Sequence, residues 1–206
     1  MIRRRELLAR LAGVVALPAG VLAGWFGGTA RAQGKNAMTP QAMVALFQKH
    51  MDAELAGDLD TTMATMGATP HLNHVPTMAG GVGADGVRAF YRDHLVDKFF
   101  PPDLKVNAIS RTVGETQVVE ELVLSFTHTI AMDWLLPGVA PTGRPVEVAV
   151  AVIVGFKDGK ISHEHIYWDQ ASVLVQIGLL DPKGLPVGGR EVARKVADPT
   201  LPPRRI

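Results

Sequence analysis

The order of two patterns along the chain restricts its fold more than any other feature. From Leu104 to Asp169, β-branched and apolar residues form long runs separated by short polar turns, whereas the part before Leu104 carries apolar residues at three- and four-residue steps. The first pattern predicts antiparallel strands and the second predicts amphipathic helices. Helices followed by a block of strands are typical of an α+β domain. We therefore expect helices on the concave face of a curved antiparallel sheet, with a pocket between them.

Local signals bound the expected elements. Thr39-Pro40 and Gly57 mark the start and end of the first helix, because Thr caps helices, Pro suits the first helical position and Gly ends them. We expect helices over 39–57, 58–66, 85–99 and 171–180. We expect strands over 105–113, 116–132, 145–156 and 160–169. Between the second and third helices we expect a polar segment, 71–77, and a glycine-rich turn, 80–83.

The first 32 residues have the order of regions found in a secretory signal peptide. Arg3, Arg4 and Arg5 precede an apolar run over 11–26, and small residues lead to Ala32. This order predicts cleavage near Ala32 and a periplasmic mature chain without a stable membrane anchor. Paired arginines are typical of twin-arginine export, and a general secretory signal is the alternative. The remainder divides into a domain over 33–180 and a Pro- and Gly-rich tail over 181–206, lying on the surface or disordered.

Removing the signal changes the charge of the chain. The whole sequence has 21 Lys and Arg against 20 Asp and Glu; the signal holds five and one of these, which leaves 16 and 19, or a charge of about −3. No basic stripe interleaved with aromatic residues is left, so nucleic-acid binding has no support. The sequence has no Cys, which excludes disulfides, thiolate zinc sites and a cysteine nucleophile. The core must therefore hold by packing alone.

Three segments near the C-terminus occur together in a known family. They are the hairpin FKDGKI at 156–161, the strand that follows it to Asp169, and the helix that ends in Gln-Ile-Gly at 176–178. This combination resembles the SnoaL-like proteins, and the segment 132–144 resembles a subgroup often found alongside dienelactone hydrolases. The chain has no GxSxG motif, so it cannot itself carry that hydrolase chemistry. The resemblance implies the cone-shaped fold of nuclear-transport-factor-2-like (NTF2-like) proteins, usually a homodimer.

The family also suggests a catalytic residue. Its polyketide and ester cyclases carry an aspartate general acid/base at the end of the last strand, and Asp169 stands at the matching position. Alternation along a strand places His165 and Tyr167 on the face of Asp169, and Glu164 and Trp168 on the opposite face. We therefore expect His165 and Tyr167 to line the pocket. Alternatively, Asp169 caps the next helix, or a β-bulge between His163 and Asp169 changes the face on which some of these side chains lie. If Glu164 and Trp168 approach His128 and Tyr167 does not, the site must be rebuilt around Glu164.

Three further residues are candidates for the pocket. His128 lies on the apolar face of the second strand and could assist Asp169 in proton transfer, although a buried core histidine is the alternative. His74 lies in the polar segment at the expected mouth of the cone, and a surface loop is the alternative. Trp134 lies in a Pro- and Gly-rich loop that must cover a pocket or a neighbouring subunit. We expect His74 and Trp134 to contact the substrate.

Metal and cofactor sites have little support in the sequence. His163 and His165 are two residues apart on a strand and could share a metal ion with His128 or His74, but the HExxH motif and clusters of carboxylates are missing. The glycines at 80–83 form neither a dinucleotide-binding fingerprint nor a P-loop. We therefore expect neither a metal nor a cofactor.

Two functions follow from this pocket. The first is a cyclase-, isomerase- or hydratase-type enzyme that acts on a small carbonyl-containing or aromatic molecule, with Asp169 as general acid/base and His128 assisting. The second is a non-catalytic ligand-binding or accessory dimerisation module, since one fold serves many functions. A homodimer is also expected, because both faces of the strand over 145–156 are apolar and one of them needs a partner surface.

Overall fold

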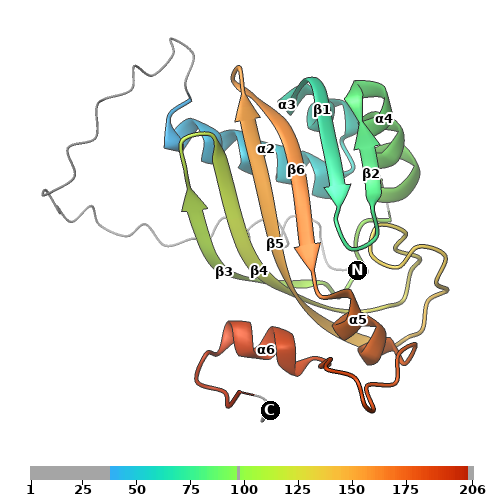
Figure 1. Ribbon diagram of the computed structural model, residues 1–206. Helices are drawn as coiled ribbons and strands as arrows, with labels where there is room; N and C mark the ends of the chain where they lie inside the picture. Colours follow the sequence, from blue (N-terminus) through green and yellow to red (C-terminus); the bar gives the residue numbers. More distant parts are fainter. Residues whose placement is uncertain (1–37, 97, 204–206) are drawn as a thin grey trace, which may run out of the picture.

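The computed structural model describes residues 38–96 and 98–203, so the signal peptide predicted over 1–32 lies outside the described residues. Six strands form one sheet in the order β2-β1-β6-β5-β4-β3, with N-terminal helices against one face (Figure 1). Neighbouring strands run antiparallel except β1 and β6, which are parallel. The expected α+β architecture is confirmed. The helices are α2 (Pro40–Ala56), α3 (Leu59–Thr65), α4 (Gly83–Phe90), the π-helical turn η1 (Tyr91–Leu95), α5 (Gln170–Ile177) and α6 (Glu191–Ala197), and the strands are β1 (Met66–His74), β2 (Ala79–Val82), β3 (Lys105–Val113), β4 (Gln117–Thr127), β5 (Pro145–Lys157) and β6 (Lys160–Trp168).

Helix α2 begins and ends where the sequence predicts. The Thr39 hydroxyl accepts a hydrogen bond from the Ala42 amide at 3.1 Å, and Gly57 ends the helix with a φ of 72°. Its buried residues are Met43, Phe47, His50 and Ala53, one of which is polar. Since residues three and four apart share a helix face, this stripe carries His50 into the core.

Strands β1 and β2 replace the polar segment and glycine-rich turn expected over 71–83. The residues of β1 alternate: Leu72 and His74 are buried, while His71 and Asn73 are half-buried. Gly80 makes the pairing of β2 possible, because a Cβ atom on it would lie 1.9 Å from the carbonyl oxygen of Leu72. The glycines therefore permit close approach of two strands rather than an open turn.

A β-bulge in β6 decides which of its side chains reach the interior. Phe156 of β5 pairs with Ile161, but the preceding Gly155 pairs with His163, so Ser162 is the extra residue on β6. A bulge of this kind shifts the alternation by one position. As a result Ile161 is buried on the same side as Glu164, and His163 faces the other way.

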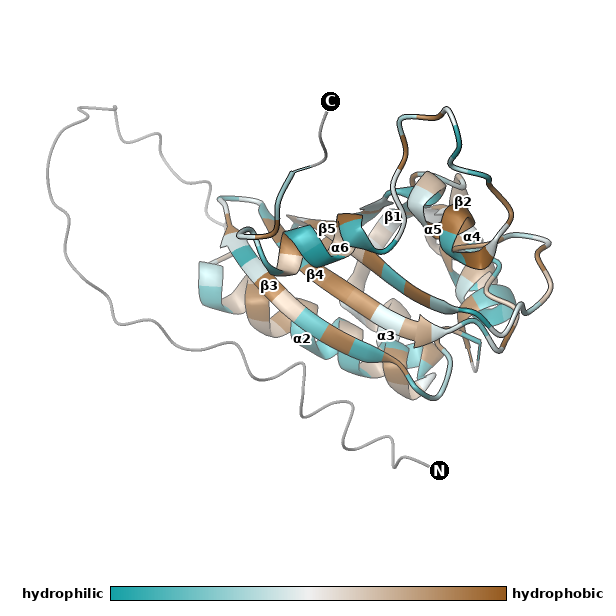
Figure 2. Ribbon diagram, turned by 90° about the horizontal axis from the view of Figure 1, so that it is seen from below, coloured by the Kyte–Doolittle hydropathy of each residue, from teal (hydrophilic) through white to brown (hydrophobic). Residues whose placement is uncertain are grey.

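The C-terminal tail contains a helix that the sequence analysis did not predict. Helix α6 lies on the face of the sheet opposite to α2 and α3 (Figure 2). Its Ala193 is buried, and Arg194 forms an ion pair of 2.6 Å with Glu147 at the start of β5. The tail is thus anchored on the outer face of the sheet.

Strand β4 is shorter than expected because the chain leaves the sheet after Thr127. The segment that follows folds back with Met132, Trp134, Leu135 and Leu136 almost fully buried.

Within residues 38–96 and 98–203, no helix is both long and apolar enough to cross a bilayer.

Candidate active site

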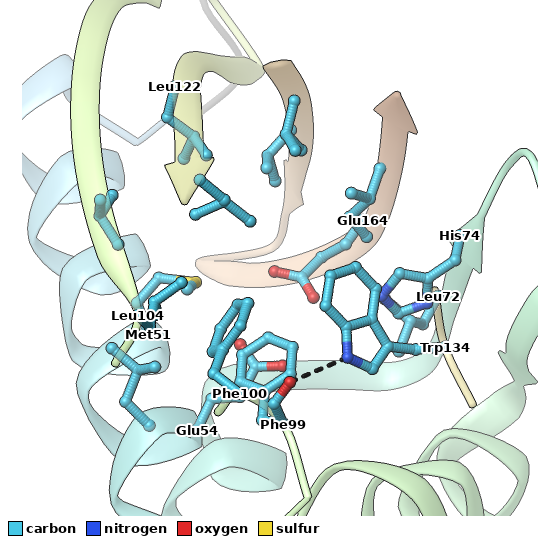
Figure 3. A pocket seen from close by; sticks show the side chains of 16 residues that line it. Met51, Glu54, Leu72, His74, Phe99, Phe100, Leu104, Leu122, Trp134 and Glu164 are labelled. Carbon is cyan, nitrogen blue, oxygen red and sulfur yellow. Dashed lines mark hydrogen bonds between the residues drawn. The ribbon is translucent and has the colours of Figure 1, made fainter. Parts of the chain in front are cut away.

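A cavity lies between α2, the inner face of the sheet and the loop that carries Trp134 (Figure 3). Its volume is about 80 Å³, and it is partly open to solvent. Three side chains in its wall bear titratable groups: Glu54 from α2, His74 from β1 and Glu164 from β6. The other wall residues are apolar, namely Met51, Leu55, Leu72, Phe99, Phe100, Leu104, Val106, Leu122, Leu124, Trp134, Val150, Val152 and Ile166.

Behind the cavity wall, a hydrogen-bonded chain begins at Thr65. The Thr65 hydroxyl donates to the carbonyl oxygen of Thr62 at 2.6 Å. Its oxygen lies 2.7 Å from Nδ1 of His50, and because its own proton is already used, it must accept from that nitrogen. His50 Nδ1 therefore carries a proton, which leaves Nε2 as the nitrogen that faces the cavity side.

The chain continues through Tyr91 to Glu164. His50 Nε2 lies 3.2 Å from the Tyr91 hydroxyl, and that hydroxyl donates to Glu164 Oε2 at 3.0 Å. The other oxygen, Oε1, is buried and lies 3.3 Å from His50 Nε2, with which it forms an ion pair. Tyr91 opens the π-helical turn η1, a local deviation that often marks functional sites. Glu164 thus has Oε2 in a hydrogen bond with Tyr91 and Oε1 in an ion pair with His50.

The charges of His50 and Glu164 stabilise each other. Burial by itself would lower the pKa of His50, but the charge of Glu164 and its hydrogen bond raise that pKa to about 9. Burial would raise the pKa of Glu164, yet the His50 charge and the hydrogen bonds from His50 and Tyr91 hold it below its ordinary value. Burial and the charges of Glu164 and Glu54 raise the pKa of Tyr91 well above its usual range, so its hydroxyl stays protonated. At neutral pH the pair is an imidazolium and a carboxylate.

Glu54 has the opposite protonation state from Glu164. Loss of water around its carboxyl group raises its pKa to about 8; the His50 charge lowers the pKa and Glu164 raises it further. Figure 3 shows both carboxyl groups at the same cavity, Glu164 from the sheet and Glu54 from the helix. The cavity therefore holds a carboxylate that can accept a proton and a carboxylic acid that can donate one.

His74 and Trp134 lie in the cavity wall, where the sequence analysis placed them. His74 Nδ1 lies 3.2 Å from the carbonyl oxygen of Ala79, so it is the protonated nitrogen, and burial lowers the pKa of His74 to about 4. Trp134 donates from its indole nitrogen to the Phe99 carbonyl oxygen at 3.0 Å and packs against the His74 ring at 5.2 Å between centroids. His74 is thus neutral and can only accept a hydrogen bond through Nε2.

Asp169 does not reach the cavity. It is the N-cap of α5, and its Oδ1 accepts a hydrogen bond from the Ser172 amide at 3.0 Å. This is the capping alternative from the sequence analysis, and it is common for Asp directly before a helix. The structure therefore does not place Asp169 where a cavity ligand could exchange a proton with it.

The expected orientation of β6 is wrong. His165 is half-buried and Tyr167 is exposed on the outer face, whereas Glu164 lies in the cavity wall and Trp168 is buried. Trp168 packs edge-on against Trp134 at 5.7 Å between centroids. The whole set sits on the opposite faces from those expected, because Asp169 leaves the strand as a helix cap and so does not fix its parity.

His128 is a buried residue outside the cavity wall. Its Nδ1 accepts a hydrogen bond from the Thr142 amide at 3.3 Å, and its backbone pairs with Arg144 and Gly143. These bonds join the two ends of the loop that carries Trp134. The structure brings His74 and Trp134 together with Glu164, but not Asp169 or His128.

The sequence reasoning missed His50, Glu54 and Tyr91. A signal was present for two of them: Glu54 stands four residues after His50, so both extend the inward stripe of α2 that begins with Met43 and Phe47. Polar residues on an otherwise buried helix face require partners, and such pairs are candidates for an active site. Tyr91 carried no comparable signal, because aromatic residues are common in a core.

Comparisons with known proteins agree with this architecture. The family model described as SnoaL-like polyketide cyclase matches residues 47–177. A protein from Jannaschia sp. CCS1, assigned to the SnoaL-like polyketide cyclases, superposes with a TM-score of 0.53 at 19% identity, covering 73% of this chain and 99% of that one. An NTF2-like protein from Burkholderia xenovorans LB400 has a TM-score of 0.51 at 12% identity, covering 68% and 98% of the two chains.

A third solved structure is AclR from Streptomyces galilaeus, which its description assigns to the hydroxylases. It superposes with a TM-score of 0.50 at 20% identity, over 69% of this chain and 89% of that one. Identities this low establish the fold and not the reaction. A comparison with curated proteins gives no match. The family match over 47–177, together with the six-stranded sheet and its N-terminal helices, shows that this chain belongs to the SnoaL-like polyketide cyclase family and has an NTF2-like fold.

Proposed function

We propose that this protein is an enzyme that moves a proton at the carbon beside the carbonyl group of a small, largely apolar molecule, as cyclases and isomerases do. One observation carries the proposal: Glu164 and Glu54 line one cavity, and the pKa of the first is lowered while that of the second is raised to about 8. Opposite shifts of two carboxyl groups at one site are typical of a base and an acid that work together.

Glu164, which lies in the cavity wall, acts as the base. It takes the proton from carbon, and the electron pair of the broken C–H bond moves onto the carbonyl oxygen as an enolate. The carboxylic acid of Glu54 donates a hydrogen bond or its proton to that oxygen. The enol carbon then recovers a proton in an isomerisation, or attacks a second carbonyl carbon in a cyclisation.

The hydrogen-bonded chain holds the base in place. Tyr91 donates to Glu164 Oε2, and His50 is fixed between Tyr91 and Thr65. These contacts and the ion pair with His50 fix the orientation of the Glu164 carboxylate in the cavity wall. The apolar wall excludes water from this carboxylate and strengthens its electrostatic interactions.

Exchange of hydrogen for deuterium beside a carbonyl tests the proposal without knowledge of the natural substrate. Proton NMR in D₂O would follow a panel of small cyclic ketones, starting with 2-tetralone, in the presence of the protein. We expect catalysed exchange by the wild type and a loss of about 10²–10⁴-fold in Glu164→Gln, the usual contribution of a general base. Asp169→Asn is the matched control, since it changes a carboxylate outside the cavity, and it should exchange at the wild-type rate.

Two outcomes would refute the assignment: equal exchange by the wild type and Glu164→Gln, or loss of exchange in Asp169→Asn. The apolar wall also supports a second candidate, binding of an apolar molecule without turnover. Tight binding of a ketone whose hydrogens are never exchanged would favour this second function.

We further propose that the chain acts after export. Retention of residues 1–32 on the chain isolated from its host would contradict that.

A further inference from the structure

Three histidines gather on the face of the sheet opposite to the cavity. His71 comes from β1, and His163 and His165 come from β6, where His71 is the register partner of His163. The three rings form a triangle with centroids 4.9 to 5.0 Å apart. All three side chains are half-buried and therefore reachable from solvent. The mechanism proposed above uses none of them.

Two of these rings point their nitrogens at each other. Nε2 of His71 lies 3.0 Å from Nε2 of His165. Two imidazole nitrogens this close cannot both carry a proton, so one N–H donates to the lone pair of the other. When that shared proton is removed, both lone pairs are directed at the space between the rings.

This spacing is that of two ligands on one metal ion. Imidazole nitrogens bind zinc at about 2.0–2.1 Å, so two of them on one ion are roughly 2.9 Å apart at a right angle and roughly 3.3 Å apart at a tetrahedral angle. The observed 3.0 Å lies between these values. The pairing of β1 with β6 holds the two strands in register, so little rearrangement is needed.

The third histidine is turned away from this point. His163 Nδ1 lies 3.1 Å from the Ser162 hydroxyl, and its Nε2 lies 3.5 Å from the side-chain amide of Gln117. Its ring stacks on that of His71 with an interplanar angle of 7°. Gly155 leaves room for it, because a Cβ atom there would lie 2.0 Å from the His163 ring. His163 thus supports the His71 ring and is not placed to bind the same ion.

We propose that His71 and His165 chelate one divalent transition-metal ion of the nickel, copper or zinc class on the outer face of the sheet. No group of three or more His, Asp or Glu side chains within 38–96 and 98–203 is arranged to hold one ion, so the protein supplies two ligands and water fills the other positions. Neutral imidazole is a good ligand for these ions and a poor one for magnesium or calcium. Binding must displace the shared proton.

Titration calorimetry with nickel chloride tests this proposal, using the chain purified without a histidine tag. We expect one ion per chain, release of protons on binding, and no binding of magnesium. His71→Gln and His165→Gln should each weaken nickel binding by about ten-fold or more, because one imidazole loses the effective concentration supplied by its partner. Circular dichroism would confirm that both variants keep the fold.

Two variants serve as controls. His163→Gln should retain most of the affinity, since this side chain is not placed as a ligand. His94→Gln removes a separate surface histidine, whose Nδ1 lies 3.5 Å from Asp133, and it should bind nickel like the wild type. Equal affinity of the wild type and His71→Gln, or loss of binding in His94→Gln, would overturn the proposal. Loss of binding only in His163→Gln would do the same.

Discussion

His50 is charged in a buried position because each of its ring nitrogens has a partner. Thr65 accepts from Nδ1, and Tyr91 and Glu164 lie beside Nε2. An isolated charge at this depth would be unstable, whereas a paired and hydrogen-bonded one is tolerated. Each partner therefore contributes to stability as well as to the orientation of Glu164.

Replacing Thr65 with Val tests the first link of this chain. The side chains have similar shapes, but Val cannot accept from His50 Nδ1 and leaves a buried donor without a partner. We expect the free energy of unfolding in urea to fall by about 1–3 kcal/mol. Thr69→Val, on an exposed position of β1, is the control and should change it by less than about 0.5 kcal/mol. Equal values for the two variants would contradict the role of Thr65.

Stability should decrease as the pH rises above neutrality. The pKa of His50 is raised from 6.5 to about 9, and the pKa of Glu54 is raised from 4.5 to about 8. The folded chain therefore holds the Glu54 proton that the unfolded chain releases between about pH 4.5 and 8, and the His50 proton between about pH 6.5 and 9, so the free energy of unfolding falls as pH rises through these windows. We expect a loss on the order of a few kcal/mol.

The acid side has different causes. The contribution of Glu164, whose pKa is lowered, is present above its ordinary value of 4.5 and is lost as pH falls below it. The pKa of His74 is lowered to about 4, so the unfolded chain takes up its proton first as pH falls below 6.5. Urea unfolding of the wild type and of His50→Gln, measured across these pH ranges, checks the predicted fall in the free energy of unfolding at alkaline pH. A wild-type free energy that is constant from about pH 6.5 to 9 would show that His50 and Glu54 are not perturbed as described.

At the scale of elements, α5 depends on Asp169 for its first turn. The carboxylate accepts from the Ser172 amide, one of the backbone groups that a helix start leaves without a partner. Asp169→Ala should lower the free energy of unfolding by about 0.5–2 kcal/mol, while Asp169→Asn, which also caps, should change it little. Thermal unfolding of the two variants measures this. A larger loss of unfolding free energy in Asp169→Asn than in Asp169→Ala would mean that the carboxylate charge, and not the capping hydrogen bond, stabilises the helix.

Most elements could be predicted because their signals are local. Thr39, Pro40 and Gly57 set the limits of α2, and the alternation of β4 correctly separated its inner face from its polar outer face. Helix α6 and strand β1 were missed because they pack against elements distant in the sequence, α6 against β5 and β1 against β6. Strand β2 was missed because Gly80 has the character of a turn residue until its close approach to Leu72 is known.

The site was harder to predict than the fold, because the expected orientation of β6 depended on Asp169 as a pocket residue, and Asp169 is instead the N-cap of α5. The bulge at Ser162 separates Ile161 from His163, and the hairpin sequence at 156–161 gives no sign of it. The sequence named Glu164 as the alternative centre of the site if Glu164 and Trp168 approached His128; Glu164 lies in the cavity wall, whereas His128 does not. His74 and Trp134 line the cavity, and their contact with a substrate stays a prediction.

At the scale of the whole molecule, α6 changes the argument for a dimer without removing it. The outward residues Ala149, Ala151 and Ile153 of β5 are half-buried, and α6 packs over part of this face. Tyr167 beside them is 40% exposed, so an apolar area is left uncovered. We expect light scattering to give twice the mass of one chain, and Tyr167→Glu to give the mass of one. A monomeric wild type at micromolar concentration would refute this prediction.

We infer that one cavity holds two carboxyl groups, Glu54 and Glu164, in opposite protonation states. Carbon-13 NMR of protein labelled at the glutamate side-chain carboxyl measures this directly, with Glu54→Gln and Glu164→Gln assigning the two signals. We predict that the Glu54 signal titrates at about pH 8 and that the Glu164 signal titrates below its ordinary 4.5. Titration of both signals near 4.5, or of Glu164 above Glu54, would contradict the proposed acid and base.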